Sequence, residues 1–390
     1  MACCHRTRLP GGAGLPADSG RAMVTIMMSG APDAAAESGQ ADLPRIRAEV
    51  ERALDGFLAR QRGDLVGMSV ELAPCVDAIA DLLTGGKRLR AAFCYWGWRA
   101  CGGSDRPAIF AAAAALELLH ASALVHDDVM DASDTRRGKP AAHKRFAARH
   151  AAAQWRGSAD GFGSGAAILI GDLLLAWTDE LLRTSGMPAD AVWRGLLVLD
   201  AMRSEVFAGQ FLDLVSQASA DSAVESALRV VRLKSAKYTV ERPLHLGAAL
   251  AGRGAAARSA FTRYGIPLGV AFQLRDDILG VFGDPAQTGK PVTDDLREGK
   301  RTVMLAIAAE RADAAQAELL DTSIGDPGLG ESQADQVKAI ITSTGALAEC
   351  ESMIDASVKE ALGALDDAPI TPRARSALAE LAIAATSRTT

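Results

Sequence analysis

The chain has 390 residues, about half of them hydrophobic, and its 42 basic and 48 acidic side chains give a net charge of −6. This balance argues against a nucleic-acid-binding surface, which needs a basic stripe, so any anionic substrate must be held by local cations or by metal. Alanine and leucine dominate while aromatic residues are few, which favours helix over sheet.

We expect a disordered N-terminal extension over 1–40 followed by one helical domain over 41–390. The extension has arginines but no sustained apolar core, so it does not resemble a secretory signal. Met23, Met27 and Met28 leave open a start further along the chain. The six cysteines show no CxxC pair and no framework spacing. They are typical of free thiols in a reducing compartment, which predicts a cytoplasmic protein.

From residue 41 on, the sequence predicts helix after helix. Leu43, Ile46, Val50, Leu54 and Leu58 recur at spacings of three and four, which indicates an amphipathic helix. No segment offers the roughly 18 uninterrupted apolar residues of a membrane span. No strand alternation and no internal repeat is visible. The predicted fold class is therefore all-α, with further helices over 73–83, 91–101, 106–126, 142–152, 166–184, 189–218, 222–237, 301–319, 333–344, 346–364 and 372–386.

The helix over 106–126 runs into an acidic cluster. Asp127 and Asp131 are four residues apart and share one helix face, where their charges repel. A divalent cation reverses that repulsion, and Mg²⁺ typically takes one or two carboxylates plus substrate phosphates. Arg136 and Arg137 follow at once and could bind those phosphates. The alternative is a solvated acidic helix end beside a basic loop.

The middle of the chain places polar groups on apolar helices. The stretch 154–165 has four glycines and predicts a flexible loop. On the next long helix, Glu205, Gln210 and Asp213 form either a core hydrogen-bond network or a substrate contact, and the sequence favours neither. Pro243 predicts a break near Thr239.

A second acidic cluster repeats the first. An apolar helix carries Gln273, Asp276 and Asp277 and is followed by a Gly/Pro-rich loop with Lys290 and Lys300. Two helices that each end in paired carboxylates and then basic residues could hold one polyanion between them through metal ions and cations. This pairing is more specific than either half, and it lowers the weight of the alternative of two solvated ends.

The ordered motifs resemble those of the trans-isoprenyl diphosphate synthases. They are GGKRLR at 85–90, DDVMD at 127–131, RRG at 136–138, GQFLD at 209–213, KSAKYT at 234–239, and FQLRDD with GKPVTDDLREGKRT up to Thr302. The resemblance implies a single large bundle of antiparallel helices around a central cavity. It also implies head-to-tail transfer of an allylic group, from dimethylallyl, geranyl or farnesyl diphosphate, to isopentenyl diphosphate.

The resemblance also implies roles for individual residues. Asp127, Asp131, Asp276 and Asp277 would bind two or three Mg²⁺ ions that bridge the allylic diphosphate. Arg136, Lys237, Lys290 and Lys300 would add positive charge there, with Tyr238 and Gln273 beside the substrate. Isopentenyl diphosphate would be oriented by Lys87, Arg90, His120 and Arg137. The catalytic set is then Asp127, Asp131, Arg136, Lys237 and Asp276.

One motif departs from the family pattern. The second acidic motif usually reads DDxxD, but here it reads DDILG, with Gly280 in the last position. Asp276 is the expected main ligand, so activity should survive, and Asp284 is a weak candidate to compensate.

Product length is predicted from the helix before Asp127. Ser122 and Ala123, one turn back, are small, whereas in the family a bulky aromatic side chain there stops growth at fifteen carbons. Leu119, further back on this face, is a candidate for the floor of the product tunnel. We therefore predict geranylgeranyl diphosphate, with farnesyl or longer products as alternatives.

The sequence argues against other function classes. His126–Asp127 spells an HD pair, as in metal-dependent phosphohydrolases, but no matching set of ligands accompanies it. A terpene cyclase would need an Asn/Ser/Glu metal triad near Asp276, and none is present. A noncatalytic partner subunit would be expected to lose the first acidic cluster, which is intact. By resemblance, the protein is expected to be a homodimer.

Overall fold

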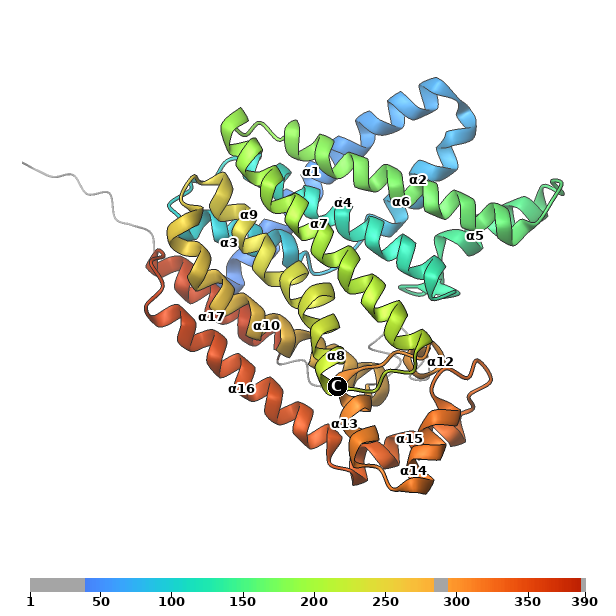
Figure 1. Ribbon diagram of the computed structural model, residues 1–390. Helices are drawn as coiled ribbons and strands as arrows, with labels where there is room; N and C mark the ends of the chain where they lie inside the picture. Colours follow the sequence, from blue (N-terminus) through green and yellow to red (C-terminus); the bar gives the residue numbers. More distant parts are fainter. Residues whose placement is uncertain (1–38, 284–293, 387–390) are drawn as a thin grey trace, which may run out of the picture. The chain divides into compact units, whose positions relative to one another are not determined.

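The computed structural model describes residues 39–283 and 294–386, which belong to one compact unit. The predicted extension over 1–40 lies outside the described residues, except for Gly39 and Gln40, which begin the first helix. The all-α prediction is confirmed, because in the described part of the chain only two-residue strands accompany the helices (Figure 1). These strands, β1 (Thr135–Arg136) and β2 (Lys139–Pro140), pair antiparallel.

The helices follow one another with short connections. Their bounds are α1 Gly39–Met68, η1 Val70–Leu72, α2 Ala73–Leu83, α3 Leu89–Ala100, α4 Pro107–Met130, α5 Ala142–Ala152, α6 Ala159–Arg183, α7 Ala189–Ala218, α8 Val224–Val230, η2 Val231–Glu241, α9 Arg242–Leu250, α10 Gly254–Phe282, α12 Asp294–Arg297, α13 Val303–Arg311, α14 Ala314–Ser323, α15 Glu331–Ser343, α16 Ala346–Asp366 and α17 Pro372–Thr386.

Helix α4 lies at the centre of the larger hydrophobic core. Its alanine run, Ala112–Ala115, is fully buried, and so are most of its larger side chains. Alanine lets neighbouring helices approach closely, and α1, α3 and α6 pack around α4. The first acidic motif forms the last turn of α4, which ends at Met130, so the packing of α4 determines the position of this motif.

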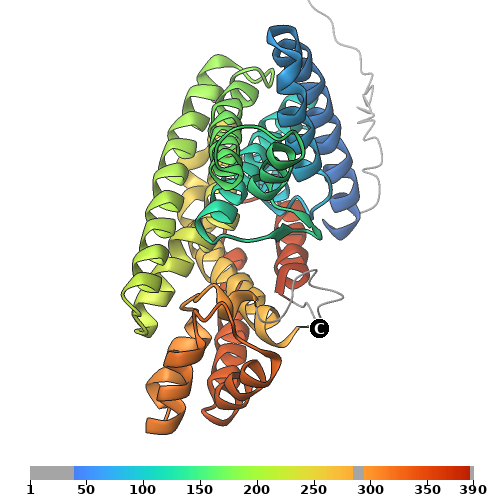
Figure 2. The same ribbon diagram turned by 90° about the vertical axis from the view of Figure 1, so that its right-hand side faces the viewer.

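Helix α10 carries the second acidic motif and packs between η2 and α16. Figure 1 shows α10 and α16 side by side, and both views place α13 to α15 at one end, beyond the last turns of α7 and α10 (Figure 2). Leu274, Ile278 and Val281 of α10 belong to a second hydrophobic cluster with α13 and α15. This cluster holds the segment after α12 against the end of α10.

Two sequence predictions about helix boundaries were wrong. The stretch 301–319 is not one helix, because Asp313 and Gln316 form a capping box that starts α14 after α13 has ended at Arg311. The predicted loop over 154–165 is largely helical. Ser158 caps α6 by accepting from the Gly161 amide at 3.1 Å. Gly163 is needed for packing, since a Cβ there would lie 2.2 Å from the His143 carbonyl of α5.

The segment predicted to break near Thr239 is instead wound more widely. Residues Val231–Glu241 form a π-helix, η2, and Pro243 sits in the first turn of α9. A π-helix bonds residues five apart rather than four, so it rotates side chains relative to α-helical spacing, and such turns are frequent at functional sites. The direction of each side chain in KSAKYT therefore could not be read from α-helical periodicity.

Two helices, α4 and α6, have the length and hydropathy of a membrane span, contrary to the expectation from sequence. In α4 the apolar window is 72% buried within the fold, as in the core helix of a soluble protein. In α6 only 39% of the window is buried.

Candidate active site

The two acidic motifs face one cavity. It has a volume of about 870 Å³ and lies between α4, α7, η2, α10 and the segment 295–302. The prediction that the acidic ends of α4 and α10 meet is thus confirmed. The predicted site residues that line the cavity are Lys87, Arg90, His120, Ala123, Asp127, Arg136, Tyr238, Gln273, Asp276, Asp277 and Lys300.

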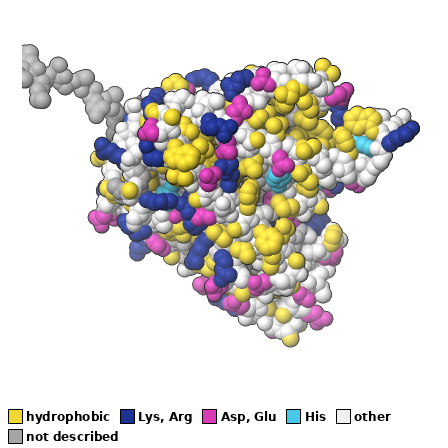
Figure 3. Space-filling model, turned by 45° about the horizontal axis from the view of Figure 1, so that its top comes forward, with side chains coloured by type: hydrophobic (Ala, Val, Ile, Leu, Met, Phe, Trp, Pro, Cys, Tyr) yellow, Lys and Arg dark blue, Asp and Glu magenta, His cyan; other side chains and the backbone are white. Residues whose placement is uncertain are grey.

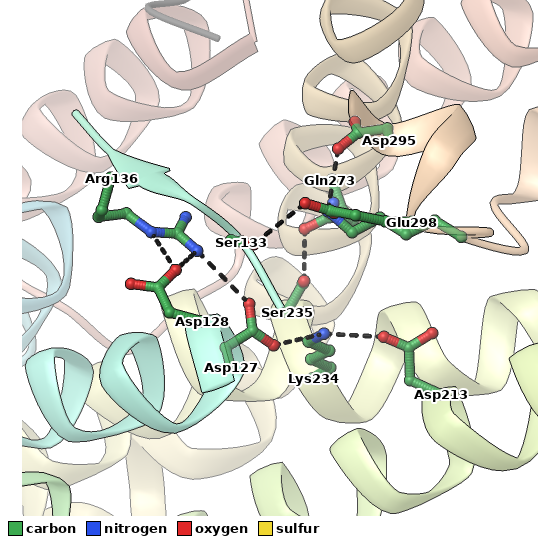
Figure 4. Close-up of polar contacts among 11 residues, drawn as sticks. Asp127, Asp128, Ser133, Arg136, Asp213, Lys234, Ser235, Gln273, Asp295 and Glu298 are labelled. Carbon is green, nitrogen blue, oxygen red and sulfur yellow. Dashed lines mark hydrogen bonds and ion pairs between the residues drawn. The ribbon is translucent and has the colours of Figure 1, made fainter. Parts of the chain in front are cut away.

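The first motif holds its arginine through a residue that sequence reasoning missed. Asp128 is 1% exposed and accepts from Nε of Arg136 at 2.8 Å and also from Nη2 of the same side chain. The same guanidinium lies 3.9 Å from Asp127 (Figure 4). A buried charge-assisted pair of this kind fixes a side chain firmly, so Asp128 positions Arg136 at the cavity wall.

Asp127 and Asp131 differ in their ionisation. Burial and the negative charge of Asp127 raise the pKa of Asp131 to about 6. Burial also acts to raise the pKa of Asp127, but the charges of Lys234, Lys300 and Arg136 outweigh it and hold that pKa low. Two carboxylates that cannot comfortably ionise together are an arrangement that a divalent cation would stabilise. Asp131 itself caps α4 and does not line the cavity.

Lys234, and not Lys237, faces the acidic motif. The Lys234 ammonium lies 3.3 Å from Asp127 Oδ1 and 2.8 Å from Asp213 Oδ2 (Figure 4). Lys237 does not line the cavity and instead binds Glu205 at 2.8 Å and Glu241 at 3.3 Å. The structure therefore places Lys234 on the cavity, and not Lys237, to which the sequence analysis gave the substrate contact. KSAKYT offers two lysines, and only the π-helix decides which one points inward.

Of the three polar residues of α7 left undecided by the sequence, two line the cavity. Gln210 and Asp213 do so, whereas Glu205 lies behind η2. There Glu205 binds Lys237 and forms a bidentate pair with Arg242. The core-network reading therefore holds for Glu205, while Asp213 orients Lys234.

On α10 the second motif is tied to η2. Gln273 accepts from the Ser235 hydroxyl at 2.5 Å and donates to Asp277 at 2.8 Å. Burial, with the negative charges of Asp295 and Asp276, raises the pKa of Asp277 to about 7, although the Gln273 hydrogen bond opposes this. Asp276 lines the same cavity. The carboxylates of the second motif are thus also too close together and too buried to ionise easily, and a bound cation would stabilise their charged forms.

A short segment after α12 closes the site. Lys300 lies 2.9 Å from Asp295 and 2.7 Å from Glu298, and the charges of these partners raise its pKa although burial opposes the shift. Glu298 in turn accepts from the Ser133 hydroxyl at 3.1 Å, which joins the two motifs (Figure 4). Asp295 and Glu298 were missed by sequence reasoning. Lys290 lies outside the described residues.

A second group of cations lies at the α3 side of the cavity. Arg90 donates to Thr239 Oγ1 at 3.1 Å and stacks over the Tyr238 ring, 4.4 Å from its centroid. The Tyr238 hydroxyl lies 3.4 Å from Nδ1 of His120. Burial and the surrounding arginines, Arg90 foremost, hold the pKa of His120 well below its usual value, so this imidazole is neutral. Lys87 lines the same wall.

Arg137 does not line the cavity. It donates to the carbonyls of Thr84 at 3.0 Å and Leu82 at 3.3 Å, and it lies against Gly86, where a Cβ would be 3.3 Å from its Nη2. Gly86 has φ +90°, a backbone conformation that favours glycine. In the structure Arg137 therefore fastens the GGKR turn, which carries Lys87.

The predicted tunnel residues divide in the same way. Ala123 lines the cavity, but Ser122 is 1% exposed and donates to the Gly171 carbonyl of α6 at 2.8 Å. Leu119 is buried in the core and does not reach the cavity. Of the three, only Ala123 forms its wall.

No three His, Cys, Asp or Glu side chains within 39–283 and 294–386 are grouped so as to hold a metal ion by themselves. The donor chemistry nevertheless fits Mg²⁺, which usually takes few carboxylates and completes its shell with water and substrate oxygens. Asp127 and Asp276 line one cavity and are suited to such shared coordination.

The chain is similar to known proteins. The polyprenyl synthetase family profile matches residues 73–343. A geranylfarnesyl diphosphate synthase of Aeropyrum pernix is 35% identical over 73% of this chain and 84% of its own length. A geranylgeranyl diphosphate synthase of Mycobacterium tuberculosis is 32% identical over 86% of this chain and 91% of its own.

A solved structure agrees with the described fold. The geranylgeranyl pyrophosphate synthase of Corynebacterium glutamicum, complexed with isoprenyl diphosphate and magnesium, has a TM-score of 0.86 and 39% identity, and covers 89% of this chain and all of its own. Family, fold and the paired acidic motifs agree, and the chain belongs to the polyprenyl synthetase family as a prenyltransferase that makes trans-prenyl diphosphates.

Proposed function

We propose that the enzyme condenses isopentenyl diphosphate head-to-tail with dimethylallyl, geranyl or farnesyl diphosphate and releases geranylgeranyl diphosphate. The observation that carries this proposal is the position of Asp127 and Asp276 on one cavity, with Lys234 and Lys300 held at its acidic wall. Such a wall suits one diphosphate shared between metal and cations, and the arginine side of the cavity suits a second.

In this proposal Asp127, Asp276 and Asp277, with Asp131 next to Asp127 at the end of α4, would hold two or three Mg²⁺ ions together with the allylic diphosphate. When bound, Mg²⁺ supplies positive charge that stabilises the departing diphosphate. Arg136, Lys234 and Lys300 add fixed positive charge at the same oxygens. Each of these cations is already oriented by a carboxylate, so little reorganisation is needed when the allylic C–O bond breaks and its electron pair leaves with the diphosphate.

The second substrate lies on the arginine side. Lys87 and Arg90 bind the diphosphate of isopentenyl diphosphate, with neutral His120 beside them. Their positions align its double bond with the allylic carbon, which supplies proximity. The double bond attacks, a C–C bond forms, and the adduct loses a proton. No side chain is placed as a dedicated base in this proposal, and the released diphosphate accepts that proton.

A product of twenty carbons is part of this proposal. The wall at Ala123 offers only a methyl group, which suits a product longer than fifteen carbons. Relatives of this chain make products of different lengths, including farnesyl, geranylgeranyl, geranylfarnesyl, octaprenyl and nonaprenyl diphosphates, so farnesyl or longer products are the alternatives.

We also propose a cytoplasmic homodimer. Exposed apolar side chains lie on α6 and along α7, and Figure 3 shows hydrophobic patches on the face that carries α7. Trp193 is 65%, Leu197 57% and Phe211 66% exposed, at helical spacings that put them on one side of α7. An apolar stripe of this size suits an interface between two copies. Light scattering coupled to gel filtration tests it.

The proposed reaction is tested with purified protein, Mg²⁺, labelled isopentenyl diphosphate and each allylic primer. Chromatography of the dephosphorylated products should give a twenty-carbon alcohol. A longer main product would support the alternatives. No product without a partner synthase would instead indicate a noncatalytic subunit. Asp127→Ala should abolish turnover, whereas Asp172→Ala, on the exposed face of α6, is the matched control.

A further inference from the structure

The departure at Gly280 has a structural counterpart in Asp295. Gly280, the last residue of the second acidic motif, lines the cavity. A Cβ built on it would lie 2.0 Å from Oδ2 and 3.1 Å from Cγ of Asp295. No carbon and oxygen can approach that closely, so the Asp295 carboxylate lies where a side chain at position 280 would begin and would have to rotate away to admit one.

The carboxylate that fills this space comes from a different element. Asp295 belongs to α12, which comes after α10 in the sequence, and it lines the same cavity as Asp276 and Asp277. Its charge contributes to the raised pKa of Asp277, after burial, which places it electrostatically within the second motif. Asp276, Asp277 and Asp295 thus place three carboxylates around the end of α10, the number in a DDxxD motif, although the last position of that motif is Gly280 here.

Asp295 also determines where a cation lies. It binds Lys300 at 2.9 Å, and Lys300 is further held by Glu298, which the Ser133 hydroxyl ties to the first motif. A side chain at position 280 would push Asp295 away and would move Lys300 with it. The absence of a side chain at Gly280 therefore permits both the carboxylate and the ammonium to reach the wall.

We infer that Asp295 supplies, from α12, the cavity-facing carboxylate that position 280 cannot supply, and that the missing side chain at Gly280 allows Asp295, with the attached Lys300, to take this position. The inference rests on the proposed magnesium and diphosphate site and names a further residue of that site. Asp295 is a positioning residue for Lys300 and, with Asp276, completes the negative wall that faces the cations.

The test is a double-variant cycle between these two positions. Asp295→Ala should weaken the joint binding of Mg²⁺ and inorganic pyrophosphate, measured by calorimetry, by tenfold or more. Gly280→Asp should weaken it as well and should lower Tm, because the new side chain collides with Asp295. The double variant, Gly280→Asp with Asp295→Ala, restores a single carboxylate to the shared space and should recover most of the affinity and of the Tm.

Two controls keep the result interpretable. Gly363→Asp introduces the same change on α16, where a Cβ would meet nothing within 4 Å, and it should leave pyrophosphate binding unchanged. If Gly280→Asp does not fold, Asp295→Asn removes the charge while keeping the volume, and it should still lose affinity.

The outcomes separate this inference from the proposed function. If the unaltered protein does not bind Mg²⁺ and pyrophosphate jointly, or if Asp127→Ala binds them equally well, the proposed site itself is wrong. If the unaltered protein binds them and Asp127→Ala does not, but Asp295→Ala and Asp295→Asn bind normally, only the role of Asp295 is overturned. Losses that simply add in the double variant would overturn the shared-space relationship.

Discussion

The ammonium of Lys234 lies 3.3 Å from the carboxylate of Asp127, at the boundary between η2 and the first acidic motif. Lys234→Ala should therefore lower kcat by roughly 10²–10³-fold, the usual cost of removing one preorganised charge partner of a developing anion. Asp213 would also lose the hydrogen bond that it accepts from Lys234. Incorporation of labelled isopentenyl diphosphate measures the loss.

Lys237→Ala is the matched control for this prediction. The two lysines are three residues apart on the same π-helix, but Lys237 binds Glu205 and Glu241 outside the cavity. Its removal should lower Tm, because Glu205 and the buried Glu241 lose a cation, while kcat stays within a few-fold. Equal losses of kcat in the two variants would contradict the assignment of Lys234.

Product length should change when Ala123 is replaced by a larger residue. Ala123 lines the cavity, so Ala123→Phe should project a ring into it and shorten the main product. Chain-length analysis of the dephosphorylated products would show the shift. A variant that folds normally and keeps the original product would count against this wall as the limit.

Ser122→Phe should behave differently although it is the adjacent residue. Ser122 is buried against α6 and donates to the Gly171 carbonyl, so a phenyl ring has no space there. Overpacking of this kind costs about 1–3 kcal/mol of the free energy of unfolding. Denaturant unfolding should show this loss, and a fully stable Ser122→Phe protein with a shorter product would contradict it.

Much of this site could be predicted from the sequence, because each of its two acidic motifs is made of residues that are close together in the chain. Acidic residues followed by basic residues at the end of a helix can be recognised from their spacing in the sequence. In the structure Asp127 and Asp276 do line one cavity. The capping box at Asp313 and Gln316 was also visible as a four-residue pattern, and overlooking it gave one helix where the structure has two.

The remaining features depend on geometry that the sequence does not carry. Whether Lys234 or Lys237 faces inward depends on the π-helical winding of η2, which no periodicity in KSAKYT indicates. The meeting of Gly280 with Asp295 depends on the path of the chain between α10 and α12. Asp128 was passed over because it lies off the face shared by Asp127 and Asp131, although its burial fixes Arg136.

Close packing of α3 on α9 gives a further prediction about stability. A Cβ on Gly97 would lie 2.3 Å from the Leu244 carbonyl and 2.9 Å from its Cα, and both are backbone atoms that cannot rotate away. Gly97→Ala should therefore lower the free energy of unfolding by about 1–3 kcal/mol. Gly63→Ala, in an exposed part of α1 with nothing within 4 Å, should raise it by about 0.5–1 kcal/mol. Urea titrations of both proteins would reveal the opposite signs, and a loss of stability in both would contradict the packing argument.

Stability should fall in mild acid through His245. Burial, with the charges of Arg242 and Arg258, lowers the pKa of this imidazole from 6.5 to about 4, although Glu241 acts in the opposite direction. The ring accepts from Arg242 at Nδ1 (3.3 Å) and donates from Nε2 to the Arg258 carbonyl (3.1 Å), so the neutral form is the one that fits.

The sign of the pH effect follows from this depressed pKa. Above pH 6.5 the imidazole is neutral in both the folded and the unfolded chain. Below pH 6.5 the imidazole binds a proton in the unfolded chain but stays neutral in the folded protein. The free energy of unfolding therefore falls by up to about 1.4 kcal/mol per pH unit, until the imidazole of the folded protein is protonated near pH 4. In His245→Gln this contribution is absent. The stability gap between the two proteins in urea should therefore narrow from pH 7.5 to pH 5, by roughly 2 kcal/mol. Groups common to both proteins, His120 included, cancel in that difference, and a gap that stays constant with pH would show that His245 is not kept neutral by the fold.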